Sequence, residues 1–201
     1  MLLLKDINLN RSNRTIFKDI NISLSSHKIV TLKGKNGSGK TSLIKIMLNI
    51  LHPTSGSIYW KSKVLDKNLY DYYNNVTYIS DHMTSIKQLS VLENIKIWKK
   101  MFLSNISNNE IEGILTILNI KNFLSSKVYT LSLGEVKKLE LLRLIIEGKK
   151  IWLLDEPLTN LDEDTLKVIE QTFKDHCMNG GSILFSTHQD PKIDISEEIN
   201  L

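Results

Sequence analysis

The sequence lacks several features that would point to particular classes of protein. Alanine is absent from all 201 residues, and cysteine occurs once, at Cys177. A single cysteine excludes an internal disulfide and any metal or haem-attachment site built on a Cys-x-x-Cys pair. No uninterrupted apolar run reaches the ~18 residues that a membrane-spanning helix needs. The first residues carry neither a basic region nor a small-residue cleavage site, so we expect no export signal.

The charge balance argues against a nucleic-acid partner. The formal net charge is +4, but lysines are spread along the chain and acidic residues nearly match them. Proteins that bind nucleic acid usually gather their basic residues on one face or in one stretch. The absence of alanine, together with abundant Ile, Asn and Lys, indicates codon pressure in an AT-rich genome, such as that of a reduced bacterium or an organelle. Part of the lysine surplus then has a mutational origin.

Strand-like runs alternate with helical segments along the chain. The strand-like runs lie at residues 2–10, 15–24, 28–34, 57–60, 76–80, 151–154 and 182–186. Helical spacing of apolar residues follows Thr41 and recurs in the second half of the chain. This alternation predicts an α/β domain. Residues 88–126 have a helical pattern with two polar breaks, so we expect one domain over residues 1–201 with a helical subdomain inserted at about residues 82–135.

The sequence GKNGSGKT is a complete P-loop between a predicted strand and a predicted helix. Its residues are Gly34, Lys35, Asn36, Gly37, Ser38, Gly39, Lys40 and Thr41. Glycines let the backbone turn tightly so that successive N–H groups point at phosphate oxygens, and the helix N-terminus adds positive potential. Lys40 would reach the β- and γ-phosphates, and the Thr41 hydroxyl would ligate Mg²⁺. We therefore predict a phosphate-binding site in a P-loop NTPase.

The segment IWLLDEP places two acidic residues after an almost wholly apolar run. A run of that kind suits a strand that is buried on both faces of a parallel sheet. Asp155 is expected to hold the metal, directly or through water, and Glu156 to polarise an attacking water. On its own, a pair of acids at a strand end often only caps a helix. The P-loop favours the functional interpretation, because it needs a carboxylate that carries the metal.

The segment LSLGE offers a second place for an anion. The Ser132 hydroxyl, the Gly134 amide and the N-terminus of a predicted helix lie together there. Alone, this pattern indicates only a capped helix. Here it lies between the P-loop and the DEP segment, and in that position it resembles the signature of ATP-binding cassette (ABC) ATPases, whose common form is LSGGQ. The resemblance spans the whole chain and implies an ABC-type nucleotide-binding domain that hydrolyses Mg-ATP.

The resemblance also implies a homodimer that encloses two ATP molecules. In that family the signature of one copy faces the P-loop of the other, so Ser132, Gly134 and Glu135 would contact the partner's nucleotide. This signature departs from the common form at two positions. Glu135 replaces the usual glutamine, and Leu133 stands where glycine or alanine is usual. Both departures would weaken contacts across the interface.

Two later segments complete the family's order of motifs. LTNLD, at residues 158–162, is similar to the D-loop, which crosses the dimer interface and here contains Asp162. STHQ contains His188, and the resemblance implies that this is the switch histidine, which touches the γ-phosphate of its own subunit's nucleotide. A solitary histidine after a strand is more often an ordinary surface residue. With the family's motifs in place, we predict Lys40, Glu156 and His188 as the catalytic residues.

Two further positions differ from the family pattern. The glutamine that normally follows the strand at residues 76–80 is missing, and either His82 or Met83 takes its place, depending on where a gap is set. The aromatic residue that usually stacks on adenine is replaced by Arg11, whose guanidinium plane can also stack on a base. Phe17, which we expect in the core, is the other candidate for the adenine contact.

Several details look like the CcmA family, the ATPase subunits of the cytochrome c maturation system of bacteria and mitochondria. These details are the short length, Arg11 before RTIFKDINISL, the segment DHMTSIKQLSVLENIKIW, and HQ instead of HD at the switch histidine. The resemblance implies a membrane complex in which ATP hydrolysis drives release of a haem-loaded chaperone. It does not imply that this subunit binds haem. The alternatives are a subunit of another ABC transporter and a nucleotide-dependent switch without transport.

A peripheral membrane location follows from this resemblance. The chain would lie on the matrix side of the mitochondrial inner membrane if it is organelle-encoded, and otherwise on the cytoplasmic side of the bacterial inner membrane. Its partners would be integral membrane subunits. Residues 98–102 (WKKMF) fall in the helical subdomain that meets such subunits in this family. A solvated amphipathic helix is an equally good interpretation of this stretch.

Overall fold

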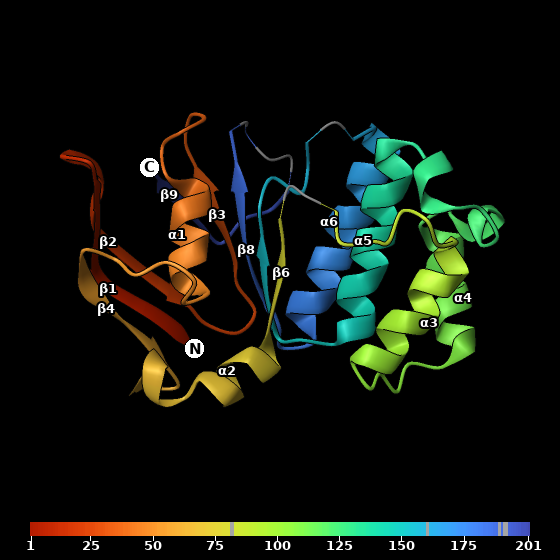
Figure 1. The fold of residues 1–201 in the computed structure, drawn as a ribbon, viewed down its shortest axis with the longest axis horizontal. Helices are drawn as coiled ribbons and strands as arrows, with labels where there is room; N and C mark the ends of the chain where they lie inside the picture. Colours follow the sequence, from red (N-terminus) through yellow and green to blue (C-terminus); the bar gives the residue numbers. More distant parts are fainter. Residues whose placement is uncertain (81–82, 160, 189, 191–192) are drawn as a thin grey trace.

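The computed structural model describes residues 1–80, 83–159, 161–188, 190 and 193–201. The strands are β1 (Leu2–Arg11), β2 (Arg14–Leu24), β3 (Ile29–Lys33), β4 (Ser55–Trp60), β5 (Lys63–Val64), β6 (Val76–Ile79), β7 (Ile151–Leu154), β8 (Ser182–Thr187) and β9 (Glu197–Asn200). They form an antiparallel sheet with the order β2-β1-β4-β5 and a parallel sheet with the order β6-β7-β8-β3-β9 (Figure 1). The predicted α/β class is confirmed.

In the described part of the chain, six α-helices surround the parallel sheet, some directly on it and some in a further layer (Figure 1). They are α1 (Lys40–Met47), α2 (Leu69–Asn75), α3 (Val91–Met101), α4 (Asn108–Ile117), α5 (Leu133–Glu147) and α6 (Glu163–Met178), with single turns of 3-10 helix at residues 65–67, 121–123 and 128–130. Figure 1 shows α1 between the two sheets, and α5 and α6 on the side of the parallel sheet away from α1. The helices α3 and α4 lie beyond α5. They fall within the predicted helical subdomain, whose limits stay a prediction.

The parallel sheet explains how residues far apart in sequence reach one place. β7 pairs with β6 on one side and β8 on the other, and β8 pairs in turn with β3. All of these pairings are parallel, so the carboxyl ends of the strands meet at one edge of the sheet. The P-loop follows β3, Asp155 follows β7, and His188 follows β8. The fold therefore gathers these three segments at the same edge.

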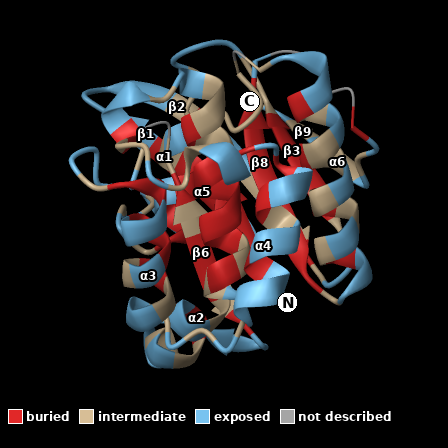
Figure 2. Cartoon of the chain, turned by 90° about the vertical axis from the view of Figure 1, so that its right-hand side faces the viewer, coloured by how far each residue is buried: buried red, intermediate tan, exposed pale blue. Residues whose placement is uncertain are grey.

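The core has two apolar clusters, one on each face of the parallel sheet. In β7, Ile151 and Leu153 belong to the cluster beneath α1, whereas Trp152 and Leu154 belong to the cluster beneath α5 and α6. This alternation follows from the two-residue period of a strand. It explains why the whole strand is apolar, as a strand covered on both faces must be. Figure 2 shows the sheet and the inner face of α5 as buried.

The starts of three helices share one sequence pattern, Ser-x-x-Glu. In each case the serine side chain accepts a hydrogen bond from the glutamate N–H, and the glutamate side chain accepts one from the serine N–H. The pairs are Ser90 with Glu93 in α3, Ser107 with Glu110 in α4, and Ser132 with Glu135 in α5. Such a capping box satisfies donors that the first helical turn leaves unpaired.

The expected strands and main helices are confirmed, but three elements were not foreseen. The shortest is β5, a two-residue strand that pairs with β4. Another is α2, whose sequence LYDYYNN does not repeat at helical spacing. The third is β9, a short polar strand at the outer edge of the parallel sheet, where it pairs only with β3 among the described strands. Within the described residues, no helix combines the length and the apolar character required to cross a bilayer.

Candidate functional site

The P-loop is shaped by glycines that no other residue could replace without strain. Gly39 has φ +107°, and a Cβ built on it would lie 2.7 Å from Cγ2 of Ile16. A Cβ on Gly34 would lie 2.8 Å from the backbone oxygen of Leu201. Gly39 is also the N-cap of α1, and its carbonyl accepts the hydrogen bond from the N–H of Leu43. The loop therefore leads directly into the helix N-terminus, whose unpaired N–H groups can bind an anion.

Lys40 lies inside this loop, with a side chain that is only 6% exposed. Its ammonium donates to the carbonyl oxygens of Gly34 at 2.7 Å and Lys35 at 3.2 Å. It also forms an ion pair with Oε1 of Glu156 at 3.3 Å. The other carboxylate oxygen of Glu156 lies 2.9 Å from Nδ1 of His188. The structure thus brings together Lys40, Glu156 and His188, the three predicted catalytic residues.

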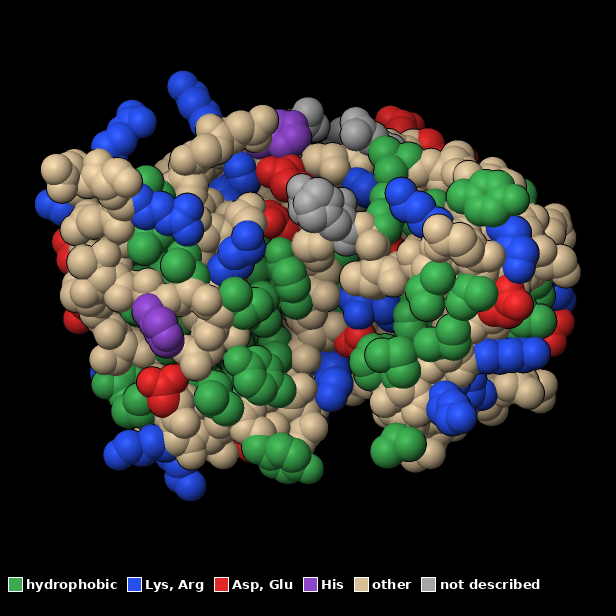
Figure 3. All heavy atoms as spheres, viewed as in Figure 1, with side chains coloured by type: hydrophobic (Ala, Val, Ile, Leu, Met, Phe, Trp, Pro, Cys, Tyr) green, Lys and Arg blue, Asp and Glu red, His purple; other side chains and the backbone are tan. Residues whose placement is uncertain are grey.

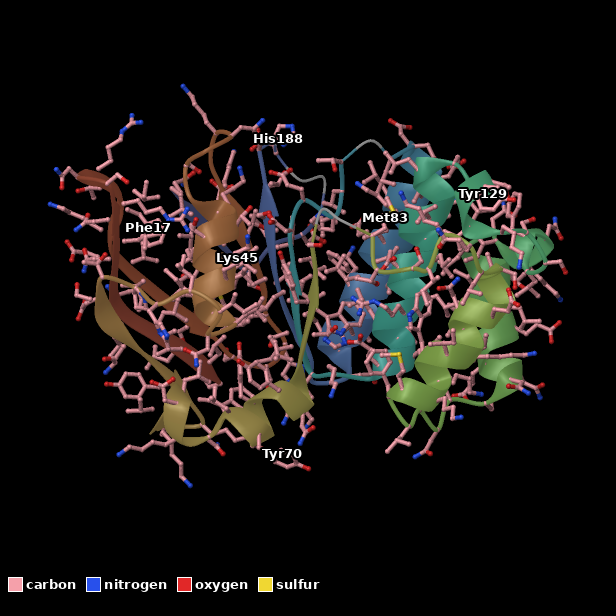
Figure 4. The ribbon with its side chains drawn as sticks, viewed as in Figure 1. Phe17, Lys45, Tyr70, Met83, Tyr129 and His188 are labelled. Carbon is pink, nitrogen blue, oxygen red and sulfur yellow. The ribbon has the colours of Figure 1, made fainter. Side chains whose placement is uncertain are left out.

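Figure 4 places His188 at the upper edge of the molecule. In Figure 3 a histidine lies beside acidic side chains at the upper edge of the view, where Figure 4 places His188. A pocket at this edge is lined by Arg11, Ile16, Asn36, Gly37, Gly39, Lys40, Thr41, Ser42, Glu156, Thr159 and His188. Most of its lining residues come from the predicted nucleotide-binding set. Residues 132–135 of the signature are not part of this lining as far as the chain is described.

The predicted metal ligands, Thr41 and Asp155, are in direct contact. The Thr41 hydroxyl donates to Oδ2 of Asp155 at 2.7 Å, and the Ser186 hydroxyl donates to Oδ1 of the same carboxylate. Asp155 is 3% exposed. One hydroxyl and one carboxylate, side by side and next to a phosphate-binding loop, fit Mg²⁺, which takes few protein ligands and completes its shell with phosphate oxygens and water. Sequence reasoning missed Ser186, because a serine inside an apolar strand carries no local signal.

Glu156 has an unusual backbone conformation. Its φ is +50°, in the left-handed region that residues with a side chain seldom adopt. Its N–H donates to the Ser186 hydroxyl at 2.9 Å, and its carbonyl accepts from the Thr159 hydroxyl at 3.0 Å. Strain of this kind persists only where surrounding contacts fix the backbone, and it often occurs at functional sites. These contacts direct the Glu156 carboxylate to Lys40 and His188.

Arg11 and Phe17 have different positions relative to the pocket. Arg11 is exposed and lines it, next to a tight turn in which Ser12 and Asn13 both have positive φ. Phe17 is 6% exposed and packs against the backbone of Gly39, where a Cβ would lie 2.9 Å from its ring. Phe17 is therefore a core residue, as expected. Arg11 stays the predicted contact for the base.

The signature lies at the N-terminus of α5. Ser132 is the N-cap, and its hydroxyl donates to Oε2 of Glu135 at 2.8 Å. A Cβ on Gly134 would meet nothing within 4 Å, and its φ is not in the left-handed region. No crowding inside this chain explains a glycine at that position. The predicted role of the signature concerns a second copy, and this single chain does not test it.

The remaining predicted residues are only partly described. Asp162 caps α6, because its carboxylate accepts from the N–H of Thr165 at 2.7 Å. This hydrogen bond and one from the Thr165 hydroxyl hold the pKa of Asp162 below its ordinary value. A role for Asp162 across a dimer interface stays a prediction. His82 lies outside the described residues, whereas Met83 lines a cavity together with Asp155 and Glu156.

Comparison with known proteins gives consistent matches. A sequence model of the ABC transporter family matches residues 17–159. The protein named cytochrome c biogenesis ATP-binding export protein CcmA from Aliivibrio fischeri is 30% identical, covering 98% of this chain and 96% of its own length. The protein of the same name from Reclinomonas americana is 35% identical, covering 91% of this chain and 82% of its own length.

Solved structures share the fold. A putative ABC transporter ATP-binding protein from Pyrococcus furiosus has a TM-score of 0.85 and 20% identity, covering 100% of this chain and 96% of its own. A dimeric ATP-binding cassette in a post-hydrolysis state with ADP and Pi has a TM-score of 0.75 and 22% identity, covering 94% of this chain and 88% of its own. Because the matched region contains both the P-loop and the acidic pair at the end of β7, we conclude that this chain belongs to the ABC transporter family, as an ATP-binding subunit that hydrolyses ATP.

Proposed function

We propose that this chain hydrolyses Mg-ATP between two copies of itself and thereby drives a membrane complex of cytochrome c maturation. The observation that carries the proposal is the contact of Glu156 with both Lys40 and His188, at 3.3 and 2.9 Å, beside the P-loop. Lys40 binds the β- and γ-phosphates, His188 contacts the γ-phosphate, and Glu156 accepts a proton from the attacking water. Thr41 and Asp155 would hold Mg²⁺, which would offset the negative charge on the phosphates.

The contacts of Glu156 with Lys40 and His188 suggest how the base is made available. Phosphate oxygens of ATP compete for the same ammonium and imidazole groups that Glu156 contacts. When Lys40 and His188 turn to the γ-phosphate, the Glu156 carboxylate loses these partners and can orient water. The backbone contacts from Ser186 and Thr159 keep Glu156 in place during this exchange. Preorganised groups of this kind lower the barrier without reorganisation at the moment of reaction.

Two features of the signature support a dimer. Gly134 has open space around it, as close approach of another molecule requires. Tyr129 and Leu133, just before and within the signature, are 67% and 47% exposed, and large apolar side chains with such exposure are often found at interfaces. Figure 4 shows Tyr129 at the upper right of the molecule. A second copy could therefore cover this surface and bring its own P-loop to Ser132.

The cytochrome c maturation role rests on the relatives of that name. The helical subdomain is the proposed contact for integral membrane subunits. Trp98 itself is buried and belongs to the core, whereas Met101 and Leu103 are 66% and 84% exposed. The proposed location is peripheral, on the matrix side of the mitochondrial inner membrane for an organelle-encoded chain or on the cytoplasmic side of a bacterial inner membrane. No haem contact and no nucleic-acid partner are proposed for this subunit.

Purification of a tagged chain from its native membranes tests this role. The proposal predicts recovery of integral membrane subunits of the cytochrome c maturation complex together with the chain. A Lys40→Met variant, which cannot bind phosphate normally, is a useful companion, because cells that carry it should lose covalently haem-bound c-type cytochromes. Recovery of the membrane subunits of a different transporter, with c-type cytochromes unaffected, would contradict the role in cytochrome c maturation and leave the ATPase assignment intact.

A further inference from the structure

Lys137 links the signature helix to the loop after the catalytic acids. It lies in α5, five residues beyond Ser132, and its side chain is neither fully buried nor free in solvent. Its ammonium donates to the carbonyl oxygen of Thr159 and, at 2.8 Å, to the Thr159 hydroxyl. Thr159 belongs to the segment that follows Glu156. A lysine on one element thus binds both polar groups of a residue on another.

Thr159 in turn binds Glu156. The Thr159 hydroxyl donates to the Glu156 carbonyl at 3.0 Å, so Lys137, Thr159 and Glu156 form a continuous chain of hydrogen bonds. Lys137 and Thr159 also line the cavity that reaches Asp155 and Glu156. Burial lowers the pKa of Lys137, and the nearby Glu156 carboxylate opposes that shift. The Lys137 ammonium is therefore joined to the Glu156 backbone through Thr159 and lies on the same cavity as the Glu156 carboxylate.

We propose that Lys137 is a positioning residue for ATP hydrolysis, which makes the placement of Glu156 depend on the placement of the signature helix. The inference rests on the proposed function, in which the signature contacts the partner's nucleotide. Ser132 and Lys137 lie within two turns of the same helix, so a contact that shifts the signature also shifts the backbone from which the Lys137 side chain reaches Thr159. Lys137 then holds Thr159, and Thr159 holds the backbone that carries Glu156.

The consequence is that a change at Lys137 should act on turnover and not on nucleotide binding. The ammonium is not part of the P-loop pocket lining, which includes Lys40 and Thr159 but not Lys137 among the described residues. A catalytic base displaced by about 1 Å can reduce the rate up to about a hundredfold. If the role of Lys137 were purely structural, its substitution would instead reduce stability and impair nucleotide binding and turnover together.

The test compares Lys137→Met, Lys137→Arg and Lys63→Met in the full chain, with its membrane subunits if the chain alone does not turn over. Lys63 is an exposed lysine on β5, outside every site proposed above, and is the control. The inference predicts that Lys137→Met lowers kcat by about tenfold or more, with the Kd of ATP and the unfolding midpoint close to wild type. Lys137→Arg, which keeps the charge and the donors, should restore part of kcat. Lys63→Met should behave as wild type.

A second variant keeps the inference testable if Lys137→Met does not fold. Thr159→Val retains the shape of Thr159 but removes the hydroxyl that joins Lys137 to Glu156. It should also lower kcat, and the double variant should be no slower than the slower single one, because both changes break the same link. A wild-type kcat in Lys137→Met would overturn the inference, and so would a loss that affects only KM and stability. If the wild-type chain still dimerises with ATP, the proposed function stands even then. A wild-type chain that never dimerises with ATP would overturn both.

Discussion

At the scale of single residues, the carboxylate oxygens of the two acids after β7, Asp155 and Glu156, all have polar partners. Asp155 is 3% exposed, yet hydroxyl groups of Thr41 and Ser186 donate to its two carboxylate oxygens. Buried charges are tolerated when hydrogen bonds satisfy them. A carboxylate held in this way has a fixed direction, and its Oδ2 faces the hydroxyl that is the other predicted metal ligand. The two acids at the end of β7 therefore have separate proposed tasks: Asp155 holds the metal, and Glu156 activates the attacking water.

Asp155→Asn tests the metal-holding task. The amide keeps the shape of the side chain but removes the negative charge, so Mg²⁺-dependent ATP binding should weaken about tenfold or more. ATP binding measured in EDTA should change little, because the P-loop is intact. Titration calorimetry with and without Mg²⁺ measures the two ATP affinities separately. Asp164→Asn, at a side chain that is 95% exposed, is the control. An equal loss with and without Mg²⁺ would show that Asp155 does not act through the metal.

The altered signature leads to a second prediction. Gln at position 135 can form the same capping box as Glu135 but carries no charge opposite the partner's phosphates. Glu135→Gln should therefore raise the ATP hydrolysis rate at a given protein concentration by about two- to fivefold, the range of one exposed charge interaction. Glu93→Gln changes the equivalent residue of the capping box of α3 and should leave the rate unchanged. A rate that is unaffected in both variants would place Glu135 away from the partner's nucleotide.

At the scale of elements, α5 contacts α3, α6 and β6. The signature lies at its start, Lys137 follows, and a buried ionic group occupies its second half. Arg143 pairs with Glu147 at 2.6 Å and donates to the Tyr78 carbonyl at 2.9 Å. Glu140 accepts from the N–H groups of Thr84 at 2.8 Å and Ser85 at 2.7 Å. The helix therefore holds both the end of β6 and the segment that leads into α3.

Arg143→Met tests this arrangement. It removes the positive charge between Glu140 and Glu147, whose side chains are 5% and 4% exposed. Breaking a buried ion pair by removing one partner costs about 3–5 kcal/mol. Urea unfolding of the variant measures this loss. Lys121→Met is the control. Lys121 forms an exposed ion pair with Glu112, so its loss should change stability only slightly.

The same variant should have a characteristic pH dependence. Burial raises the pKa of Glu147 above its ordinary value, and Arg143 offsets part of this effect. Without Arg143 the pKa of Glu147 rises further. A carboxyl whose folded pKa is raised favours folding below its unfolded pKa, and this contribution is lost as the pH rises through the folded value. The deficit of Arg143→Met should therefore grow as the pH rises above the ordinary glutamate range, and a deficit independent of pH would contradict the account.

Local patterns in the sequence were enough to predict most elements. The all-apolar β7 and the glycine-rich loop before α1 specify their own structure, and parallel strand ends then bring Asp155 and His188 to the P-loop. The elements that were missed are α2 and β9, which have no clear period, and β5, which at two residues is too short to show one. β9 is a short polar edge strand, and its pairing with β3 depends on tertiary contacts. The contacts of Ser186 and Lys137 were also missed, because they join residues on different elements.

At the scale of the whole molecule, the surface proposed to meet a membrane partner lies at the end of α3. Lys99 and Lys100 lie in the last turn of α3, where basic residues favour the helix terminus. Lys99 also donates to the Asn108 side chain at 3.0 Å. Next to them, Met101 and Leu103 are exposed. A basic and apolar surface of this kind suits a partner with acidic and apolar side chains.

Charge reversal at Lys99 and Lys100 tests this surface. The double change to Glu should reduce the fraction of the chain recovered with membranes and spare ATP binding, because the site lies on other elements. The unfolding midpoint is measured in parallel, since acids at a helix C-terminus are mildly unfavourable. Reversal at the exposed Lys63 and Lys67, near β5, is the control. Unchanged membrane recovery would remove α3 as a docking element.

The central claim is that two copies close around Mg-ATP, and the mass of a hydrolysis-blocked variant tests it most directly. Glu156→Gln removes the base but leaves the P-loop and the metal ligands, so saturating Mg-ATP should trap the closed form. Light scattering should then give twice the monomer mass of 23.1 kDa, and the monomer mass without nucleotide. A pure nucleotide switch would behave like wild type in this experiment. A variant that stays monomeric with saturating Mg-ATP, both alone and with its membrane subunits, would contradict the account.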